Sequence, residues 1–433
     1  MKKLFFTVLC LWAVSLHAQK TYLHCGQIID VAKGKTLSEK TIVVSGNAIE
    51  SILNGYVNGA DTVTHIDLKK QVVMPGFIDM HVHIEHESNP RTYMNRFTEN
   101  EADVALGATV YAKRTLMAGF TTVRDLGGSG VNIALRKAIA KGTVIGPRIF
   151  TAGKAIGTTG GHADPTNGRS YDLMGDPGAR EGVVNSASDA RKAVRQRYKD
   201  GADVIKITAT GGVLSVAKNG QNPQFTADEL AAIVSTAKDY GMLTAAHAHG
   251  DEGMRRAIIA GIKTIEHGTL MEPSTMDLMV KYDAYLVPTI SAGKAAAANA
   301  AIPGYFPEVI AKKALEIGPR SQSTFAMAYK KGVKIAFGTD AGVAPHGDNA
   351  KEFGFMVAAG MPVMEAIAAA TVTNANLLGY SDSLGQLKAG YTADIVAVNE
   401  HPKANVNTLE QVVFVMKEGT IFKDKDKEVL HDY

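Results

Sequence analysis

Cysteine is scarce in this chain, whose 433 residues include two, Cys10 and Cys25. Cys10 lies in an apolar N-terminal segment that we expect to be removed, and Cys25 alone cannot form an internal disulfide. A fold that is stabilised by several disulfides is therefore excluded. Stability must therefore come from packing, and a 45% hydrophobic content over this length is enough for one large domain and a smaller one.

A strong charge of either sign is also missing. The 46 lysines and arginines against 43 acidic residues give a net charge of +3. Loss of residues 1–18, which contain Lys2 and Lys3 and no acidic residue, removes two positive charges and leaves +1. A nearly neutral protein has no general attraction to nucleic acid or to anionic membrane surfaces. We therefore expect no nucleic-acid partner.

Long apolar runs are missing beyond the N-terminus. There, Lys2 and Lys3 precede Leu4 to Leu16, an apolar stretch too short to span a bilayer comfortably. Ala18 then supplies a small residue for cleavage, so the pattern predicts a signal peptide over residues 1–18 and an exported protein, periplasmic or secreted. An uncleaved membrane anchor is the alternative. Because no second apolar span follows, we expect no integral membrane domain.

Strand-like runs lie at both ends of the chain, and strands alternate with helices between them. The terminal runs are Tyr22–Asp30, Thr41–Leu53, His65–Val73, Ala393–Asn399 and Gln411–Phe422. The central strands end at Met80, Val123, Phe150, Ile207, Ala246, Ile265, Pro288 and Phe337. Eight β-α units in roughly 310 residues are typical of a TIM barrel. We therefore expect an α/β fold, with a (β/α)8 barrel over residues 75–385 and a small β-sandwich from residues 19–74 and 386–433.

An open, doubly wound sheet is the alternative fold. It predicts a glycine-rich phosphate loop after an early strand, whereas the first such turn here holds His81 and His83. The barrel is therefore favoured.

Reactive side chains of a TIM barrel lie at the C-terminal ends of its strands. Residues i and i+2 of a strand point the same way, so His81 and His83 can hold one cation together, although a lone His-x-His motif is weak evidence. Later strands add Lys206, then His247 with His249, His267 and Asp340. Imidazole nitrogen and carboxylate oxygen suit zinc, with manganese or cobalt as alternatives.

Lys206 has apolar neighbours on both sides in its strand. Burial favours the neutral amine, which can add carbon dioxide to give a carbamate that bridges two cations. The alternatives are a lysine paired with a carboxylate, a side chain that reaches solvent, and a Schiff-base lysine. For Arg124, at the end of the second strand, we expect an ion pair with Asp125 or Asp79.

Taken in order, His-x-His, Lys, His, His and Asp resemble the amidohydrolase superfamily over nearly the whole mature chain. Several segments are similar to the prolidase-type dipeptidases, which are related to imidazolonepropionase. These segments are Gly160 to His162, Thr210 to Ser215, His247 to Gly250 and Gly338 to Gly342, whereas Val73 to Asp79 and Gly385 to Asp394 resemble the superfamily as a whole. Imidazolonepropionases resemble a one-metal design without the bridging lysine, so Lys206 speaks against that activity.

The resemblance implies two divalent metal ions, with zinc as the first choice. It places His81, His83 and Asp340 on the first metal, His247 and His267 on the second, and N6-carboxylated Lys206 between them. It also implies that Asp340 moves the proton, that His162 reaches the substrate carbonyl or carboxylate, and that His249 contacts the substrate. Loops after the strands set the pocket, so we expect Tyr305, within Ile290 to Arg320, and His346 to line it.

The implied reaction is hydrolysis of an amide bond in dipeptides, Xaa-Pro or Xaa-Lys and Xaa-Arg, or in N-acyl amino acids. An amidase for aromatic amides of the ochratoxin kind is one alternative. A Schiff-base lyase that uses Lys206 and a non-catalytic periplasmic metal-binding protein are the others. Related barrels often assemble, so the resemblance is also compatible with a homo-oligomer.

Overall fold

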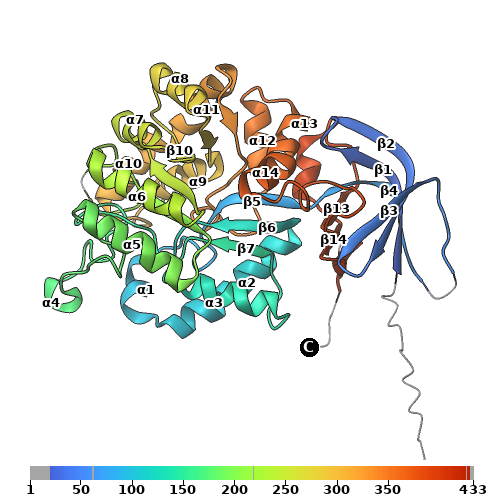
Figure 1. Ribbon diagram of the computed structural model, residues 1–433, viewed down its shortest axis with the longest axis horizontal. Coiled ribbons are helices and arrows are strands. Elements are labelled where there is room, and N and C mark those ends of the chain that lie inside the picture. Colours follow the sequence, from blue (N-terminus) through green and yellow to red (C-terminus); the bar gives the residue numbers. More distant parts are fainter. Residues whose placement is uncertain (1–19, 61–62, 218, 426, 430–433) are drawn as a thin grey trace, which may run out of the picture.

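The computed structural model describes residues 20–60, 63–217, 219–425 and 427–429. The predicted signal peptide, residues 1–18, lies outside the described residues. A barrel surrounded by helices forms the larger part of the molecule, and a mixed β-sheet lies at one end of it (Figure 1).

The mixed sheet joins strands from both ends of the chain. Its order is β16-β15-β14-β13-β4-β1-β2-β3. The strands are β1 (Lys20–Asp30), β2 (Lys35–Ser45), β3 (Ala48–Asn54), β4 (Thr64–Pro75), β13 (Ile395–Val398), β14 (Phe414–Lys417), β15 (Thr420–Asp424) and β16 (Lys427–Glu428). Buried residues of six strands, β1, β2, β3, β4, β13 and β14, form one hydrophobic cluster, so the sheet folds around a shared core.

Two of the expected terminal strands are each a pair of strands. The run Thr41–Leu53 contains parts of β2 and β3, and Gln411–Phe422 contains β14 and part of β15. Gly46 and Gly419, in the two turns, have φ angles of 58° and 78°, a left-handed conformation that glycine adopts without strain. A β-carbon on Gly419 would also lie 2.0 Å from the carbonyl oxygen of Gly46, so the two turns pack closely together.

Two arcs of parallel strands form the barrel, with orders β5-β6-β7 and β12-β11-β10-β9-β8. The strands are β5 (Phe77–Val82), β6 (Phe120–Asp125), β7 (Arg148–Thr151), β8 (Val204–Thr208), β9 (Leu243–Ala248), β10 (Thr264–His267), β11 (Tyr285–Val287) and β12 (Lys334–Ile335). Parallel bridges Ile156–Ile207 and Val82–Ala341 join the arcs at both seams. The predicted fold class, an α/β barrel with a small β-sandwich, is confirmed.

Helices follow most of the barrel strands and cover them on the outside (Figure 1). Their bounds are α1 (Thr92–Thr98), α2 (Glu101–Met117), α3 (Val131–Ala140), α4 (Tyr171–Met174), α5 (Ala187–Asp200), α6 (Ala227–Asp239), α7 (Asp251–Ala260), α8 (Pro273–Lys281), α9 (Ile290–Ala300), α10 (Glu308–Ile317), α11 (Ser321–Lys330), α12 (Lys351–Ala358), α13 (Val363–Ala368) and α14 (Asn374–Leu378). Short turns η1 (Gly318–Arg320), η2 (Ala369–Thr373) and η3 (Val406–Glu410) complete them. Helices α9 and α10 form an excursion after β11.

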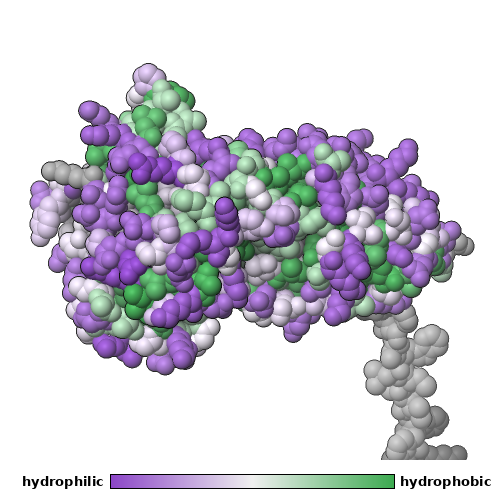
Figure 2. Space-filling view, turned by 90° about the horizontal axis from the view of Figure 1, so that it is seen from above, coloured by the Kyte–Doolittle hydropathy of each residue, from purple (hydrophilic) through white to green (hydrophobic). Residues whose placement is uncertain are grey.

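The visible surface is largely hydrophilic, with apolar residues in separate small groups (Figure 2). Among the described residues, no helix combines the length and the apolar character that a membrane crossing requires.

Candidate metal centre and active site

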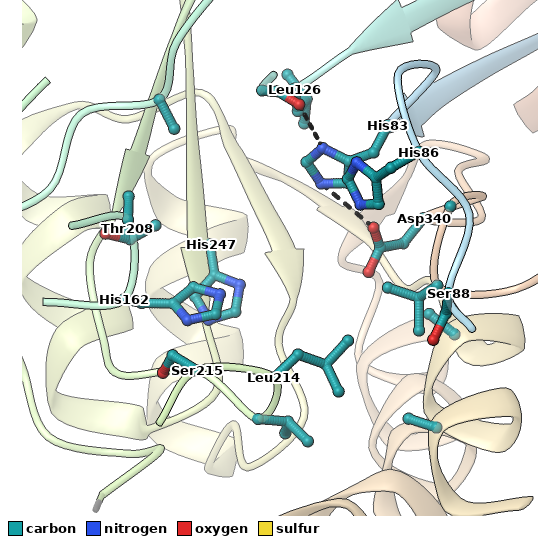
Figure 3. Close-up of a pocket in the computed structure, with 18 of the residues that line it drawn as sticks. His83, His86, Ser88, Leu126, His162, Thr208, Leu214, Ser215, His247 and Asp340 are labelled. Carbon is teal, nitrogen blue, oxygen red and sulfur yellow. Dashed lines mark hydrogen bonds and ion pairs between the residues drawn. The ribbon is translucent and has the colours of Figure 1, made fainter. Parts of the chain in front are cut away.

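The C-terminal ends of the barrel strands open into one cavity of about 580 Å³. Its walls include eight of the ten side chains singled out from the sequence: His81, His83, His162, Lys206, His247, His249, His267 and Asp340. His162 and His247 lie on one side of the cavity, and His83 and Asp340 lie on the other (Figure 3). Residues at the strand ends and His162, from the loop after β7, therefore surround a common space.

Donor atoms converge most closely around Asp340. Its Oδ1 lies 3.5 Å from Nε2 of His81 and 3.4 Å from Nε2 of His83. One ligand atom each from His81, His267 and Asp340 lie within 4.8 Å of one another. The ring of His247 has its centroid 4.6 Å from that of His267. The two predicted ligand groups are thus adjacent, as a two-metal centre requires.

The imidazole rings of His81, His83, His247 and His267 each have one nitrogen within hydrogen-bond distance of another protein group. The contacts are His81 Nδ1 to Glu266 Oε2 (2.9 Å), His83 Nδ1 to Gly127 O (2.7 Å), His267 Nδ1 to Thr289 Oγ1 (2.7 Å) and His247 Nε2 to Gly211 O (3.1 Å). For His81, His83 and His247 the carboxylate or carbonyl acceptor fixes the proton on the nitrogen it contacts, so the other nitrogen presents its lone pair. For His267 the hydroxyl of Thr289 holds the orientation of the ring. The rings are therefore oriented as metal ligands usually are.

Two buried atoms at this point have no hydrogen-bond partner among the described residues, Nε2 of His81 and Oδ1 of Asp340. Both are acceptors, and two acceptors this close are unfavourable unless a cation or a proton lies between them. Burial also holds the pKa of each of the four imidazoles well below its usual value, so the rings are neutral at pH 7. Neutral imidazoles and one carboxylate fit a divalent cation of the zinc kind.

Lys206 lies on β8, is 4% exposed and faces the cavity. No carboxylate in the described part of the chain lies within ion-pair distance of its amine, so neither a paired lysine nor one that reaches bulk solvent is observed. Burial lowers the pKa of Lys206, although the carboxylates of Glu266 and Asp340 oppose the shift. A neutral fraction of the amine is therefore available for chemistry.

Strained backbone occurs at the same strand ends. His267, Thr289 and Asp340 have φ angles of 71°, 47° and 56°, in the left-handed region that non-glycine residues rarely adopt. Each such residue costs on the order of 1–3 kcal/mol and persists where the surroundings enforce it. These backbone angles direct the side chains of His267 and Asp340 into the cavity, and Thr289 holds the ring of His267.

The ion-pair partner of Arg124 differs from the one predicted from the sequence. Its partner is neither Asp125 nor Asp79 but Glu266, whose Oε1 lies 2.8 Å from Nη2, and both side chains are 0% exposed. Asp125 is the next residue along the strand and faces the other side, where it accepts the backbone N–H of Ile84. Glu266 therefore connects Arg124 to the ring of His81.

Two side chains of this site were missed in the sequence. Glu266 directly precedes His267, and an acidic residue next to a strand-end histidine could have been read as a support for another ligand. His86 also lines the cavity, with its ring centroid 5.4 Å from that of His83. Its position three residues after the His-x-His motif was the available signal.

The predicted substrate residues divide into two groups. His162 stacks on His247 with ring centroids 4.3 Å apart, and its Nδ1 is buried without a partner among the described residues. His249 also lines the cavity, and Thr269 engages its Nδ1 at 3.0 Å. The structure does not bring His346 or Tyr305 to the cavity wall.

The reason is that both side chains are engaged elsewhere. The Nε2 atom of His346 contacts the carbonyl oxygen of His86 at 3.0 Å, and its ring stacks on Tyr111. Tyr305 donates its hydroxyl to the carbonyl of Ser88 at 3.0 Å. Phe306, the next residue, lines the cavity instead.

Gly212 provides a test of the position of His162. A β-carbon on Gly212 would lie 2.1 Å from Cε1 of that imidazole, so Gly212→Ala must displace the ring. We expect kcat/KM to fall by up to about 10²-fold, since a misplacement near 1 Å has that effect on positioned groups. The melting temperature should change little, because a side chain rather than the backbone moves. If the variant kept the kcat/KM of the wild type, His162 would have no role in the reaction.

Three comparisons place the chain among known proteins. It matches the Amidohydrolase family over residues 72–422. Ochratoxinase of Aspergillus niger is 32% identical over 432 residues, which cover 94% of this chain and 87% of that protein.

Two solved structures support the same placement. A Xaa-Pro dipeptidase with bound methionine in the active site is 51% identical, with a TM-score of 0.91 over 94% of this chain and 100% of that one. A prolidase complexed with N-methylphosphonate-L-proline is 31% identical, with a TM-score of 0.86 and the same coverage. The prediction of a prolidase-type, metal-dependent hydrolase of amide bonds is confirmed. The chain belongs to the amidohydrolase family.

Proposed function

We propose that this protein uses two divalent metal ions to hydrolyse an amide bond in dipeptides or N-acyl amino acids that carry a free carboxylate. The observation that carries the proposal is the convergence of four neutral imidazoles, a buried lysine and a buried aspartate on one cavity. A site that merely stored metal would be closed by its ligands, whereas this one adjoins a cavity of about 580 Å³.

His81, His83 and Asp340 would hold one cation, and His247 and His267 the other, with zinc as the first choice. The neutral amine of Lys206 would add carbon dioxide and release a proton, and the resulting carbamate would supply further oxygen ligands for the two ions. When bound, two such ions lower the pKa of a water molecule and polarise the scissile carbonyl.

Asp340 would move the proton. Its Oδ1 has no hydrogen-bond donor in the described part of the chain, and burial raises its pKa, although the Lys206 ammonium opposes the shift. A carboxylate of this kind can accept the proton of the attacking water and deliver it to the leaving nitrogen, which departs as an amine after protonation.

His162 would contact the substrate. Burial lowers its pKa to about 3, so the ring is neutral and can donate one N–H to the carbonyl oxygen or to the carboxylate.

The apolar part of the cavity wall supports an apolar substrate group. It is formed by Val213, Leu214, Ala292, Ala296, Phe306, Ile317 and Val343. Xaa-Pro dipeptides fit this lining and the 51% identical dipeptidase structure. The 32% identity to ochratoxinase supports a second candidate, an N-acyl aromatic amino acid.

A substrate panel tests the proposal. Zinc-loaded protein is assayed with Xaa-Pro, Xaa-Lys and Xaa-Arg dipeptides and with N-acyl-phenylalanine, each also as its C-terminal amide. We expect hydrolysis of the free acids, greatest for the apolar substrates, and much weaker hydrolysis of the amides. Chelation should abolish the activity, and zinc or manganese should restore it.

Two outcomes would contradict the proposal. Full activity in protein shown to be metal-free would remove the metal centre from the reaction. Trapping of substrate on Lys206 by borohydride would instead support the Schiff-base lyase.

A further inference from the structure

Lys313, on α10, is a buried cation that the reaction described above does not use. It is 6% exposed. Its Nζ lies 2.8 Å from the carbonyl oxygen of Gly212, 2.6 Å from that of Ser215 and 2.8 Å from that of Ala217. An ammonium group has three N–H donors, and all three are used here. Burial lowers the pKa of Lys313 to about 8, so most of it stays protonated at pH 7.

The three carbonyls belong to one loop, residues 211–217, which follows β8. Val213, Leu214 and Ser215 of this loop line the cavity. From the other side, Ile317 lines the same wall and lies at the end of the helix that carries Lys313. Val213 and Ile317 also belong to one hydrophobic cluster. Lys313 therefore joins the two chain segments that form the apolar wall.

Other side chains also hold this loop. Thr210 Oγ1 donates to the carbonyl of Gly211 at 2.8 Å, Nε2 of His247 contacts the same oxygen at 3.1 Å, and the hydroxyl of Tyr93, on α1, donates to the carbonyl of Leu214 at 2.8 Å.

Loss of the ammonium group would raise the free energy of the loop in the conformation that it has here. Three carbonyl oxygens that converge on one point repel one another. The carbonyl of Gly212 would keep a 3.3 Å contact with the hydroxyl of Ser215, whereas those of Ser215 and Ala217 would lose the ammonium donor. Loss of Lys313 should therefore release the segment around Gly212 to Ala217.

We propose that Lys313 is a positioning residue that fixes the apolar wall of the substrate cavity by binding the loop 211–217. This inference rests on the proposed function for the substrate it names, but the contact itself does not. Because the wall is shaped by the loop, Lys313 sets how strongly the enzyme prefers a large apolar group over a small one.

The first experiment needs no substrate. Zinc-loaded wild type, Lys313→Met and Lys312→Met are digested with subtilisin under native conditions, and the cut sites are mapped by mass spectrometry. Lys312 is the exposed neighbour on the same helix and serves as the matched control. We expect cleavage within residues 211–217 to be at least about tenfold faster in Lys313→Met alone. Equal rates in all three proteins would overturn the proposal, whatever the substrate is.

The second experiment separates positioning from a general loss of stability. For an apolar dipeptide and its alanine analogue, Lys313→Met should raise KM about tenfold for the apolar substrate and much less for the analogue. Equal effects on both substrates would contradict a role in the wall. If Lys313→Met does not fold, Lys313→Gln keeps two N–H donors and should show both effects to a smaller degree; wild-type behaviour in that variant would equally overturn the proposal.

Discussion

Asp340→Asn is expected to lower kcat by about 10²–10⁴-fold, the contribution of a positioned acid–base group. The amide of asparagine cannot take up the proton that the carboxylate of Asp340 is placed to accept. The other proposed ligands, His81 and His83 among them, keep their lone pairs, so the variant should retain part of its metal. The loss should therefore appear in kcat rather than in folding.

The measurement combines steady-state kinetics with metal analysis of the same sample. Asp348→Asn is the matched control, since Asp348 lies in the loop after β12 and pairs with Lys351 at the surface. That variant should keep its kcat and its metal. If Asp340→Asn had a kcat like that of the wild type, the proton would have to move through another group.

Arg124→Met is expected to lower the free energy of unfolding by about 3–5 kcal/mol, the effect of removing one partner of a buried ion pair. Glu266 would keep a charge inside the barrel at 0% exposure, with no guanidinium beside it. Because Glu266 also holds the ring of His81, metal affinity should fall by about 10–100-fold, as for other supports of metal ligands.

Denaturant unfolding of the metal-free proteins and metal titration of the folded ones give the two quantities. Arg256→Met is the control, because the exposed pair of Arg256 with Glu252 should contribute at most about 1 kcal/mol. The double variant Arg124→Met/Glu266→Gln should recover part of the lost stability, since no buried charge remains unpaired. If Arg124→Met were no more destabilising than Arg256→Met, the pair would have no structural role.

The supports of the metal ligands required the three-dimensional structure. Arg124 could be placed on the second strand from the sequence, but the two partners predicted for it, Asp125 and Asp79, were both wrong. Which acidic residue it meets depends on how the strands are staggered around the barrel, and that stagger brings Glu266 opposite Arg124. The same holds for Lys313, whose three acceptors lie about a hundred residues earlier in the chain.

Loop residues were the least predictable part of the site. His346 and Tyr305 follow barrel strands, yet their side chains turn away from the cavity to meet the carbonyls of His86 and Ser88. The direction of a loop side chain depends on the backbone angles of the loop and on the packing around it, and no sequence period encodes either.

The sequence by itself determined the barrel and the set of strand-end donors, because a strand of period two in a parallel barrel sends His81 and His83 to the same rim as His267 and Asp340. The signal peptide and the carbamate on Lys206 stay predictions. The tertiary structure alone decided which partner orients each donor and which loops close the cavity. Those contacts join residues far apart in the chain, and their geometry is fixed when the strands and helices pack together.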